Sequence, residues 1–224
     1  MNLLEKTNKV IYNKTHTLEN NVLIDPYNTH RSNFPYYLNK LGLKGTAVEI
    51  GVKNGHFSKI ILDNWEGNKL YLIDPWESQE DNIYDETHHN HNTDYEETKK
   101  NLANYPKERY EIIRDYSHNA YKHFEDNSLD FIYIDGNHSY EAVTTDIQLW
   151  YPKLKDGGVL AGDDYTVIPI EKMSSGCIFG VTKAVNDFCE QNKKNVSIQF
   201  YGDWFYKLCN TPFYIPSRNW YFIK

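Results

Sequence analysis

Apolar residues alternate along the chain between short dense runs and longer stretches with helical spacing. The short runs predict five buried strands, at residues 46–50, 69–73, 110–114, 129–134 and 159–162. Between them, apolar positions recur three or four residues apart, as Phe57, Ile60, Ile61 and Trp65 do, and this spacing predicts helices. Strands that alternate with helices predict an α/β fold, with a mostly parallel sheet covered by helices on both faces.

The predicted helices have recognisable ends. Pro35 suits the first turn of a helix over residues 34–43, and Gly42 suits its carboxyl end. Residues 155–158 are expected to form a turn into the fifth strand. The remaining helices are expected at 57–65, 95–102 and 120–124, around Val143, Ile147, Trp150 and Leu154, and around Val181, Ala184, Val185 and Phe188.

Three segments are less regular. Residues 1–30 are polar and are expected to form an N-terminal arm, which precedes a single domain over residues 31–224. Residues 77–97 are strongly polar and are expected to form a mobile loop over the site. Near the C-terminus, residues 197–201 and 204–208 are expected to form a closing hairpin.

The charge and cysteine content narrow the class of protein. The net charge is −7 and no lysine or arginine run occurs, which argues against a nucleic-acid partner. The three cysteines are scattered and odd in number, which suits reduced thiols in the cytoplasm. No signal peptide or transmembrane stretch is evident, so neither export nor a membrane partner is expected. A homo-oligomer is left open.

The first strand ends in a glycine turn that carries an acid. Glu49 precedes Gly51, and Gly55 follows four residues later at the start of a helix. Glycines allow positive φ and close approach of a ligand to the backbone. A carboxylate at this position would repel a pyrophosphate and attract a cationic ligand such as S-adenosylmethionine. The pattern Glu-x-Gly-x-x-x-Gly resembles motif I of class I S-adenosylmethionine-dependent methyltransferases; the alternative is a structural turn with an incidental Glu49.

Two further positions fit a bound nucleoside. Asp74 ends the second strand, where in this fold an acid accepts hydrogen bonds from ribose hydroxyls. Alternatively, it is a turn aspartate before Pro75. Trp76 is expected either near the adenine or in the core.

The segments after the second and third strands offer other candidates. Asp115 and Ser117 stand where the family contacts the adenine, although helix capping would explain them equally well. The histidines at 88, 89 and 91 suggest a zinc site, which we reject because no fourth soft ligand stands at a suitable spacing.

Acidic residues end the fourth and fifth strands, which are neighbours in a class I methyltransferase sheet. Asp135, Asp163 and Asp164 should therefore lie close together. Crowded carboxylates repel one another, so a divalent cation or protonation must compensate. Oxygen ligands favour Mg²⁺. Alternatively, Asp163 and Asp164 are turn residues and Asp135 contacts only substrate. Asp135 is also expected to contact the cofactor and to assist catalysis.

His138 is the expected general base. A neutral imidazole near pH 7 can take the proton of a hydroxyl group as its oxygen attacks. The alternative is a histidine with only local hydrogen bonds at a helix start.

Four segments together resemble the small class I methyltransferases of the Methyltransf_24 type. They are Leu41 to Ser58, Ile73 to Trp76, Phe131 to Glu141 and Lys155 to Tyr165. The resemblance implies a Rossmann-like, mostly parallel seven-stranded sheet with an antiparallel last strand.

The set is also similar to the metal-dependent, macrocin-type sugar O-methyltransferases. In these, the equivalents of Asp135, Asp163 and Asp164 hold Mg²⁺. One branch places its base as His138 stands here, whereas another uses an aspartate where this chain has Asn137.

The expected function is therefore Mg²⁺-assisted methyl transfer from S-adenosylmethionine to a sugar hydroxyl, in a nucleotide sugar or a glycan. A catechol or other small phenol is the alternative acceptor. A non-catalytic, cofactor-binding subunit on the same fold is the alternative of a different class.

Overall fold

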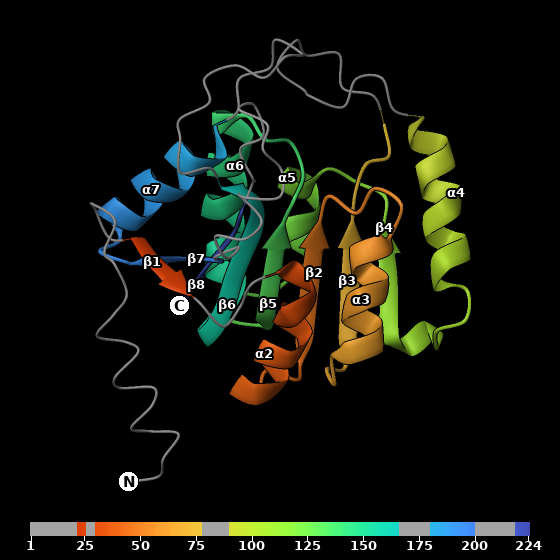
Figure 1. Cartoon of the computed structure of the whole chain (residues 1–224). Helices are drawn as coiled ribbons and strands as arrows, with labels where there is room; N and C mark the ends of the chain where they lie inside the picture. Colours follow the sequence, from red (N-terminus) through yellow and green to blue (C-terminus); the bar gives the residue numbers. More distant parts are fainter. Residues whose placement is uncertain (1–21, 26–29, 78–89, 166–179, 200–217) are drawn as a thin grey trace, which may run out of the picture.

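The computed structural model of the chain describes residues 22–25, 30–77, 90–165, 180–199 and 218–224. They form one twisted sheet with helices on both faces (Figure 1). The strands are β1 (Val22–Asp25), β2 (Thr46–Ile50), β3 (Lys69–Ile73), β4 (Tyr110–Ile113), β5 (Leu129–Ile134), β6 (Leu154–Tyr165), β7 (Val196–Gln199) and β8 (Arg218–Ile223).

The sheet has the order β1-β7-β8-β6-β5-β2-β3-β4. Neighbouring strands are parallel except β8, which is antiparallel to both β6 and β7. The predicted Rossmann-like methyltransferase sheet with an antiparallel last strand is confirmed. An additional edge strand, β1, makes eight strands in total.

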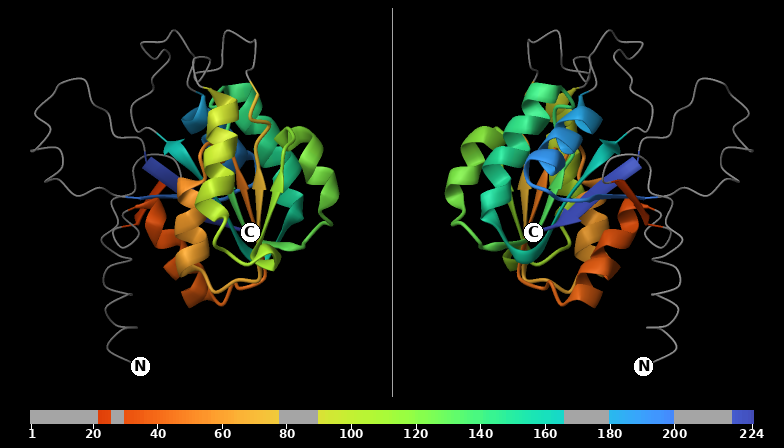
Figure 2. Two further views of the ribbon diagram at one scale, coloured as in Figure 1. Left: turned by 90° about the vertical axis from the view of Figure 1, so that its right-hand side faces the viewer. Right: turned by 90° about the vertical axis from the view of Figure 1, so that its left-hand side faces the viewer.

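Helices cover the sheet on two sides, as the edge-on views in Figure 2 show. One face carries α2 (Phe34–Leu41), α3 (His56–Asn64) and α4 (His91–Leu102), and the other carries α5 (Ser117–Ala120), α6 (Tyr140–Trp150) and α7 (Val181–Gln191). Short 3-10 turns flank these helices: η1 (Arg31–Asn33), η2 (Lys107–Arg109), η3 (Tyr121–His123) and η4 (Tyr151–Lys153).

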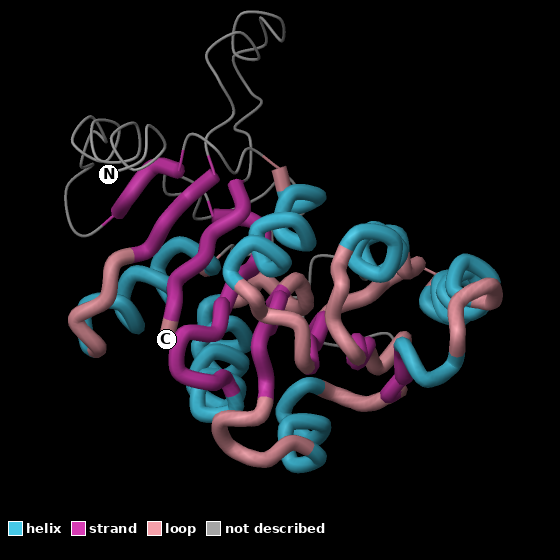
Figure 3. The backbone as a smooth tube through the Cα atoms, turned by 90° about the horizontal axis from the view of Figure 1, so that it is seen from below, coloured by secondary structure: helices cyan, strands magenta, loops and turns pink. Residues whose placement is uncertain are grey.

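Alternate residues of each central strand enter two separate cores. On β2, Ala47 packs in the core under α2 and α3, while Val48 and Ile50 pack in the core under α6 and α7. Figure 3 looks along the strands and shows the sheet lying between the two helix layers. This burial of both strand faces is why the sequence of these strands is apolar without alternation.

The edge of the sheet that contains the first and last described strands differs from the sequence-based expectations. Val22–Asp25, within the expected arm, pairs in parallel with β7 as an edge strand, while residues 1–21 lie outside the described part. The closing antiparallel pair exists, but β7 pairs with Arg218–Ile223. The expected second strand at 204–208 lies outside the described residues.

Other element boundaries also differ. The helix expected over residues 120–124 is found as the end of α5 and the 3-10 turn η3, with Phe124 in an extended conformation. Leu154 begins β6 and does not extend α6, which ends at Trp150. Residues 155–158, expected as a turn, lie within β6, where the pairing with β5 shifts register. Helix α4 begins at His91, so the end of the expected loop at 77–97 is helical, and residues 78–89 lie outside the described part. Among the described helices, none is long and apolar enough to cross a lipid bilayer.

Candidate active site

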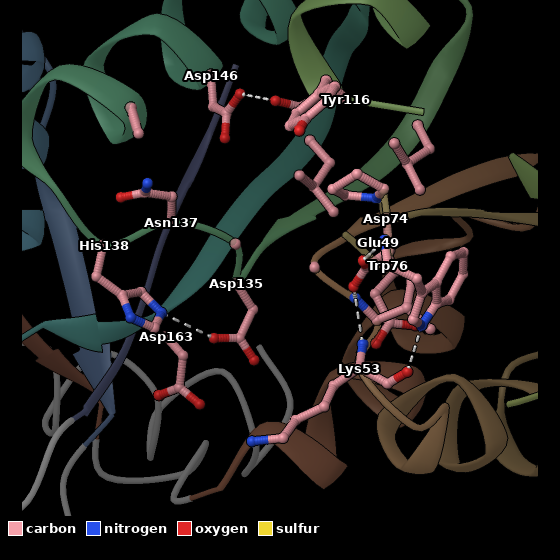
Figure 4. A pocket seen from close by; sticks show the side chains of 18 of the residues that line it. Glu49, Lys53, Asp74, Trp76, Tyr116, Asp135, Asn137, His138, Asp146 and Asp163 are labelled. Atoms are coloured by element: carbon pink, nitrogen blue, oxygen red, sulfur yellow. Dashed lines mark hydrogen bonds and ion pairs between the residues drawn. The ribbon is translucent and has the colours of Figure 1, made fainter. Parts of the chain in front are cut away.

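The carboxyl ends of β2, β3, β5 and β6, with the residues that follow β4, surround a cavity of about 620 Å³. Figure 4 shows its polar lining. Of the predicted site residues, nine line the cavity: Glu49, Gly51, Asp74, Trp76, Ser117, Asp135, His138, Asp163 and Asp164. Gly55 and Asp115 do not belong to the described lining. Most of the residues selected from the sequence therefore meet at one place.

Gly51 allows the ends of β2 and β5 to approach each other. Its φ is +82°, and a Cβ atom there would lie 2.0 Å from the carbonyl oxygen of Asp135. Its backbone N–H donates to the carbonyl of Ile73. The glycine thus serves the packing of the strand ends, in addition to lining the cavity. Gly55, at φ +76°, is the N-cap residue of α3.

Glu49 is a buried acid at the end of β2. Its side chain is 2% exposed, and Oε2 accepts a 2.5 Å hydrogen bond from the hydroxyl of Ser58 on α3. Burial raises the pKa of Glu49 to about 8, and the hydrogen bond from Ser58 only partly offsets this. A cationic ligand group beside Glu49 would stabilise its ionised form, which fits the predicted cofactor.

Asp74 holds the glycine turn together. Oδ2 accepts hydrogen bonds from the backbone N–H groups of Val52 and Lys53, at 2.9 and 3.0 Å, and Oδ1 accepts one from Trp76, at 2.7 Å. Burial nevertheless raises its pKa above the usual value. Asp74 is therefore a turn aspartate, as the alternative stated, and this is part of its role. A carboxylate has further lone pairs, so contact with ribose hydroxyls stays a prediction.

Trp76 is a core residue that also reaches the cavity. It is 2% exposed, its Nε1 donates to the carbonyl oxygen of Lys53 at 2.6 Å, and its ring lies 4.9 Å from that of Tyr95. Lys53, Trp76 and Asp164, all in the cavity wall, have positive φ values of 55°, 43° and 63°. Such backbone conformations are costly for residues other than glycine and cluster at functional sites.

Ser117 and Asp115 separate into two roles. Asp115 accepts hydrogen bonds from the backbone N–H of Tyr116 and the side-chain amide of Asn119, which are local contacts at the start of α5, but no described side chain caps this helix. Ser117 lines the cavity and donates a 2.5 Å hydrogen bond to Asp146 on α6. Asp146 was not predicted from the sequence. It is 4% exposed, and burial raises its pKa to about 7.

Arg31, at the start of η1, was also not predicted. Its Nη1 lies 3.0 Å from Oδ2 of Asp135 and 3.2 Å from Oδ2 of Asp163, and its guanidinium stands 5.2 Å from the centre of the Phe57 ring. Although burial opposes it, Tyr133 and the two carboxylates raise the pKa of Arg31, so it stays charged. Arg31 therefore offsets part of the carboxylate repulsion expected from the sequence.

A second group of side chains meets around His138. Its Nε2 lies 3.2 Å from Oδ2 of Asp164 and 3.5 Å from Oδ1 of Asp135. One ligand atom from each of these three residues lies within 4.8 Å of the others, a grouping that could hold a metal ion. Burial raises the pKa of Asp135, and the interaction with His138 partly offsets this.

Asp163 is not a member of this group, which differs from the metal set expected from the sequence. Its Oδ2 faces Arg31, and its Oδ1 accepts hydrogen bonds from the backbone of Asp164 and the amide of Asn219. Burial and the charge of Asp164 raise its pKa. The geometric group therefore contains His138 and not Asp163, and the metal set expected from the sequence stays a prediction.

Residues 48–165 match a family described as "Methyltransferase domain" (Methyltransf_24), and this match spans more than half of the chain. The chain belongs to this methyltransferase family. The expectation of an S-adenosylmethionine-dependent methyltransferase is thereby confirmed at the level of the enzyme class. No curated protein matches the sequence.

Solved structures similar to this methyltransferase share its fold at low identity. They include a putative rRNA methylase from Clostridium thermocellum (15% identity, TM-score 0.58, 93% of this chain and 98% of that chain). A putative caffeoyl-CoA O-methyltransferase from Staphylococcus aureus has 14% identity and a TM-score of 0.58, over 100% and 93% of the two chains. An O-methyltransferase from Bacillus cereus in complex with SAH has 15% identity and a TM-score of 0.57, over 99% and 90%.

Asp146 and Arg31 of this methyltransferase were not predicted, and of the two only Asp146 could have been found from the sequence. Asp146 stands on the same face of α6 as Val143 and Trp150, so it is an acid at a position where the helical spacing requires an apolar residue. An acid on an apolar helix face could therefore have identified Asp146 as a candidate site residue. Arg31 has no such signal, because its partners Asp135 and Asp163 are remote in the sequence.

Proposed function

We propose that this methyltransferase transfers the methyl group of S-adenosylmethionine to a hydroxyl oxygen, and that the acceptor is a sugar in a nucleotide sugar or a glycan. The observation that carries the proposal is the position of His138 between Asp135 and Asp164 at the mouth of strands β5 and β6. An imidazole and two carboxylates therefore lie beside the strand ends that carry Glu49 and Asp74.

The cofactor is proposed to lie across the strand ends in sheet order. Glu49 at the end of β2 would pair with the ammonium group, and Asp74 at the end of β3 would accept from the ribose. The sulfonium methyl would then face β5, where Asp135 follows directly after the strand. A buried carboxyl group such as Glu49 ionises more readily when a cationic group lies beside it, because the positive charge stabilises the carboxylate.

The chemical step is an in-line displacement. The acceptor oxygen forms a bond to the methyl carbon, the S–CH₃ bond breaks, and its electron pair stays on the sulfur. The hydroxyl proton passes to His138, and the nearby carboxylates of Asp135 and Asp164 stabilise the imidazolium that forms. Sulfonium charge disappears in the reaction, so a cavity shielded from water favours it.

A divalent cation fits the same group of side chains. Asp135, His138 and Asp164 would hold it, with Oδ2 of Asp135 still beside Arg31. This is the alternative to the base role of His138, because an imidazole that ligates a metal cannot also accept the hydroxyl proton. When bound, the cation would polarise the acceptor hydroxyl. Two carboxylates with one imidazole suit Mn²⁺ as well as Mg²⁺. The all-oxygen ligand set expected from the sequence favours Mg²⁺.

The polarity of the acceptor end favours a sugar over a phenol. The polar residues there are Arg31, Asp135, Asn137, His138, Asp163 and Asp164, and they outnumber Phe57, the aromatic residue of the lining that lies against Arg31. Their charged and amide groups match the vicinal hydroxyls of a sugar, whereas the flat ring of a phenol is bound by apolar and aromatic walls.

Formation of S-adenosylhomocysteine by the purified full-length chain tests the proposal. Nucleotide sugars, catechol and small phenols serve as acceptors, each assayed with EDTA, with EDTA followed by excess Mg²⁺, and with EDTA followed by excess Mn²⁺. Turnover with nucleotide sugars only supports the sugar assignment, and turnover with phenols only contradicts it. Full activity in EDTA would remove the metal from the account and leave His138 as the base.

A further inference from the structure

The carboxylate of Asp146 lines the cavity but takes no part in the proposed chemical step. We propose that Asp146 selects the base of the cofactor, by accepting a hydrogen bond from the exocyclic amino group of adenine. This inference rests on the proposed S-adenosylmethionine site and adds a specificity-determining residue to it.

The position of Asp146 fits recognition of a ligand. The side chain comes from α6, is 4% exposed and belongs to the cavity lining. One oxygen accepts the hydrogen bond from Ser117, while the other is directed toward the cavity, and the carboxylate lies next to Tyr116 and apart from His138 (Figure 4). An acceptor atom is therefore presented to whatever occupies this end.

The protein supplies little compensation for the charge of this carboxylate. Among the described residues, the hydroxyl of Ser117 is its hydrogen-bond partner, and no arginine or lysine pairs with it. Asp130, another buried acid, shows the usual arrangement, since it accepts from two backbone N–H groups and pairs with Lys155. A buried acid with one neutral partner is costly unless a ligand provides a further donor.

The neighbourhood of Asp146 suits a flat heterocycle. Tyr116 lies beside Asp146 (Figure 4), and Ile73 and Ala142 add apolar surface to the lining of the cavity. The order of strands places Glu49 on β2, Asp74 on β3 and Ser117 just after β4, so ammonium, ribose and base follow one another along the sheet edge. The base then lies next to Ser117 and its partner Asp146.

Asp115, which was expected to contact the adenine, lies outside the described lining of the cavity. Its Oδ1 accepts hydrogen bonds from the backbone N–H of Tyr116 and the side-chain amide of Asn119. Ser117, the other residue expected to contact the adenine, donates a hydrogen bond from its hydroxyl to Asp146. The acceptor for an adenine amino group is therefore contributed by α6.

Replacement of the amino group by an oxo group tests this assignment. Calorimetry would compare S-adenosylhomocysteine with S-inosylhomocysteine on the full-length wild type, on Asp146→Asn and on Glu141→Gln. Glu141 is the matched control, an exposed acid of the same helix that also lines the cavity. The wild type and Glu141→Gln should prefer the adenosyl ligand by roughly 10- to 100-fold, the range of one hydrogen bond to a charged group.

Asp146→Asn should reduce this preference to within about threefold, because a rotated amide can donate to an oxo group as well as accept from an amino group. An unchanged preference in a folded Asp146→Asn protein would overturn the inference, and so would equal binding of the two ligands by the wild type, a result that needs no variant. Failure of the wild type to bind either ligand would instead overturn the cofactor assignment itself.

Discussion

Nη1 of Arg31 lies 3.0 Å from Oδ2 of Asp135, although 104 residues separate the two in the chain. Arg31 follows the edge strand β1, while Asp135 ends the central strand β5. The same nitrogen also reaches Asp163, at 3.2 Å. A fixed cation from the beginning of the chain thus helps to hold together the acids at the acceptor end. It leaves the other side of Asp135 to His138.

Removal of this cation should tighten the proposed metal site. Arg31→Met leaves Asp135 and Asp163 without their shared positive partner, so affinity for Mn²⁺ should rise by roughly tenfold or more, since unit charges about 4 Å apart interact by about 1 to 4 kcal/mol. Calorimetric titration with Mn²⁺ measures this. Lys59→Met, which removes an exposed lysine of α3, is the control and should match the wild type. Equal affinities in all three proteins would contradict the account.

His138→Ala should abolish most of the turnover and spare the cofactor. Loss of a general base lowers the rate by roughly 10²- to 10⁴-fold, and the proposed binding groups Glu49 and Asp74 are untouched. Single-turnover rates and S-adenosylhomocysteine affinity are the two measurements. His123→Ala, an exposed histidine outside the cavity lining, should change neither. A wild-type rate in His138→Ala would remove the base role.

Gly51→Ala should be far more damaging than a substitution at another glycine with the same backbone angle. Gly51 and Gly157 have φ of +82° and +81°, but an added Cβ meets the Asp135 carbonyl at 2.0 Å in the first and nothing within 4 Å in the second. Gly157→Ala should cost about 1 kcal/mol of unfolding free energy. Gly51→Ala should cost about 3 kcal/mol or more, because the strand ends must also move apart. Urea unfolding compares them, and similar losses would contradict the packing role.

Glu49→Gln should change how stability depends on pH. Burial raises the pKa of Glu49 from 4.5 to about 8 in the folded protein. Between these values the folded form holds a proton that the unfolded form has lost, so this group makes stability fall as pH rises from about 4.5 to about 8. Glutamine removes that contribution. In the absence of ligand, the stability advantage of Glu49→Gln should therefore grow across this window and level off above pH 8. A constant difference in urea unfolding at pH 5 to 9 would contradict the raised pKa.

The central strands were predictable residue by residue, for a physical reason. Strands β2, β3 and β5 have the predicted bounds, because each is a dense apolar run that ends at a glycine or an acid. The convergence of the acids at those ends on one cavity was also predictable, because parallel strands bring their carboxyl ends to one edge.

Pairings between remote segments were not predictable in the same way. The short strand β1 joins the sheet only through β7, and β8 inserts between β7 and β6, which no local pattern indicates. The contact of Arg31 with Asp163, which turns one oxygen of this acid away from His138, is equally non-local. The signal for Asp146 was local, since an acid interrupts an apolar helix face.

A crystal structure of the protein with S-adenosylhomocysteine tests the central claim most directly. The account predicts the ammonium group beside Glu49, the ribose at Asp74, and the sulfur directed toward Asp135 and His138. A ligand bound in the reverse direction, with adenine at His138, or bound outside this cavity, would contradict it.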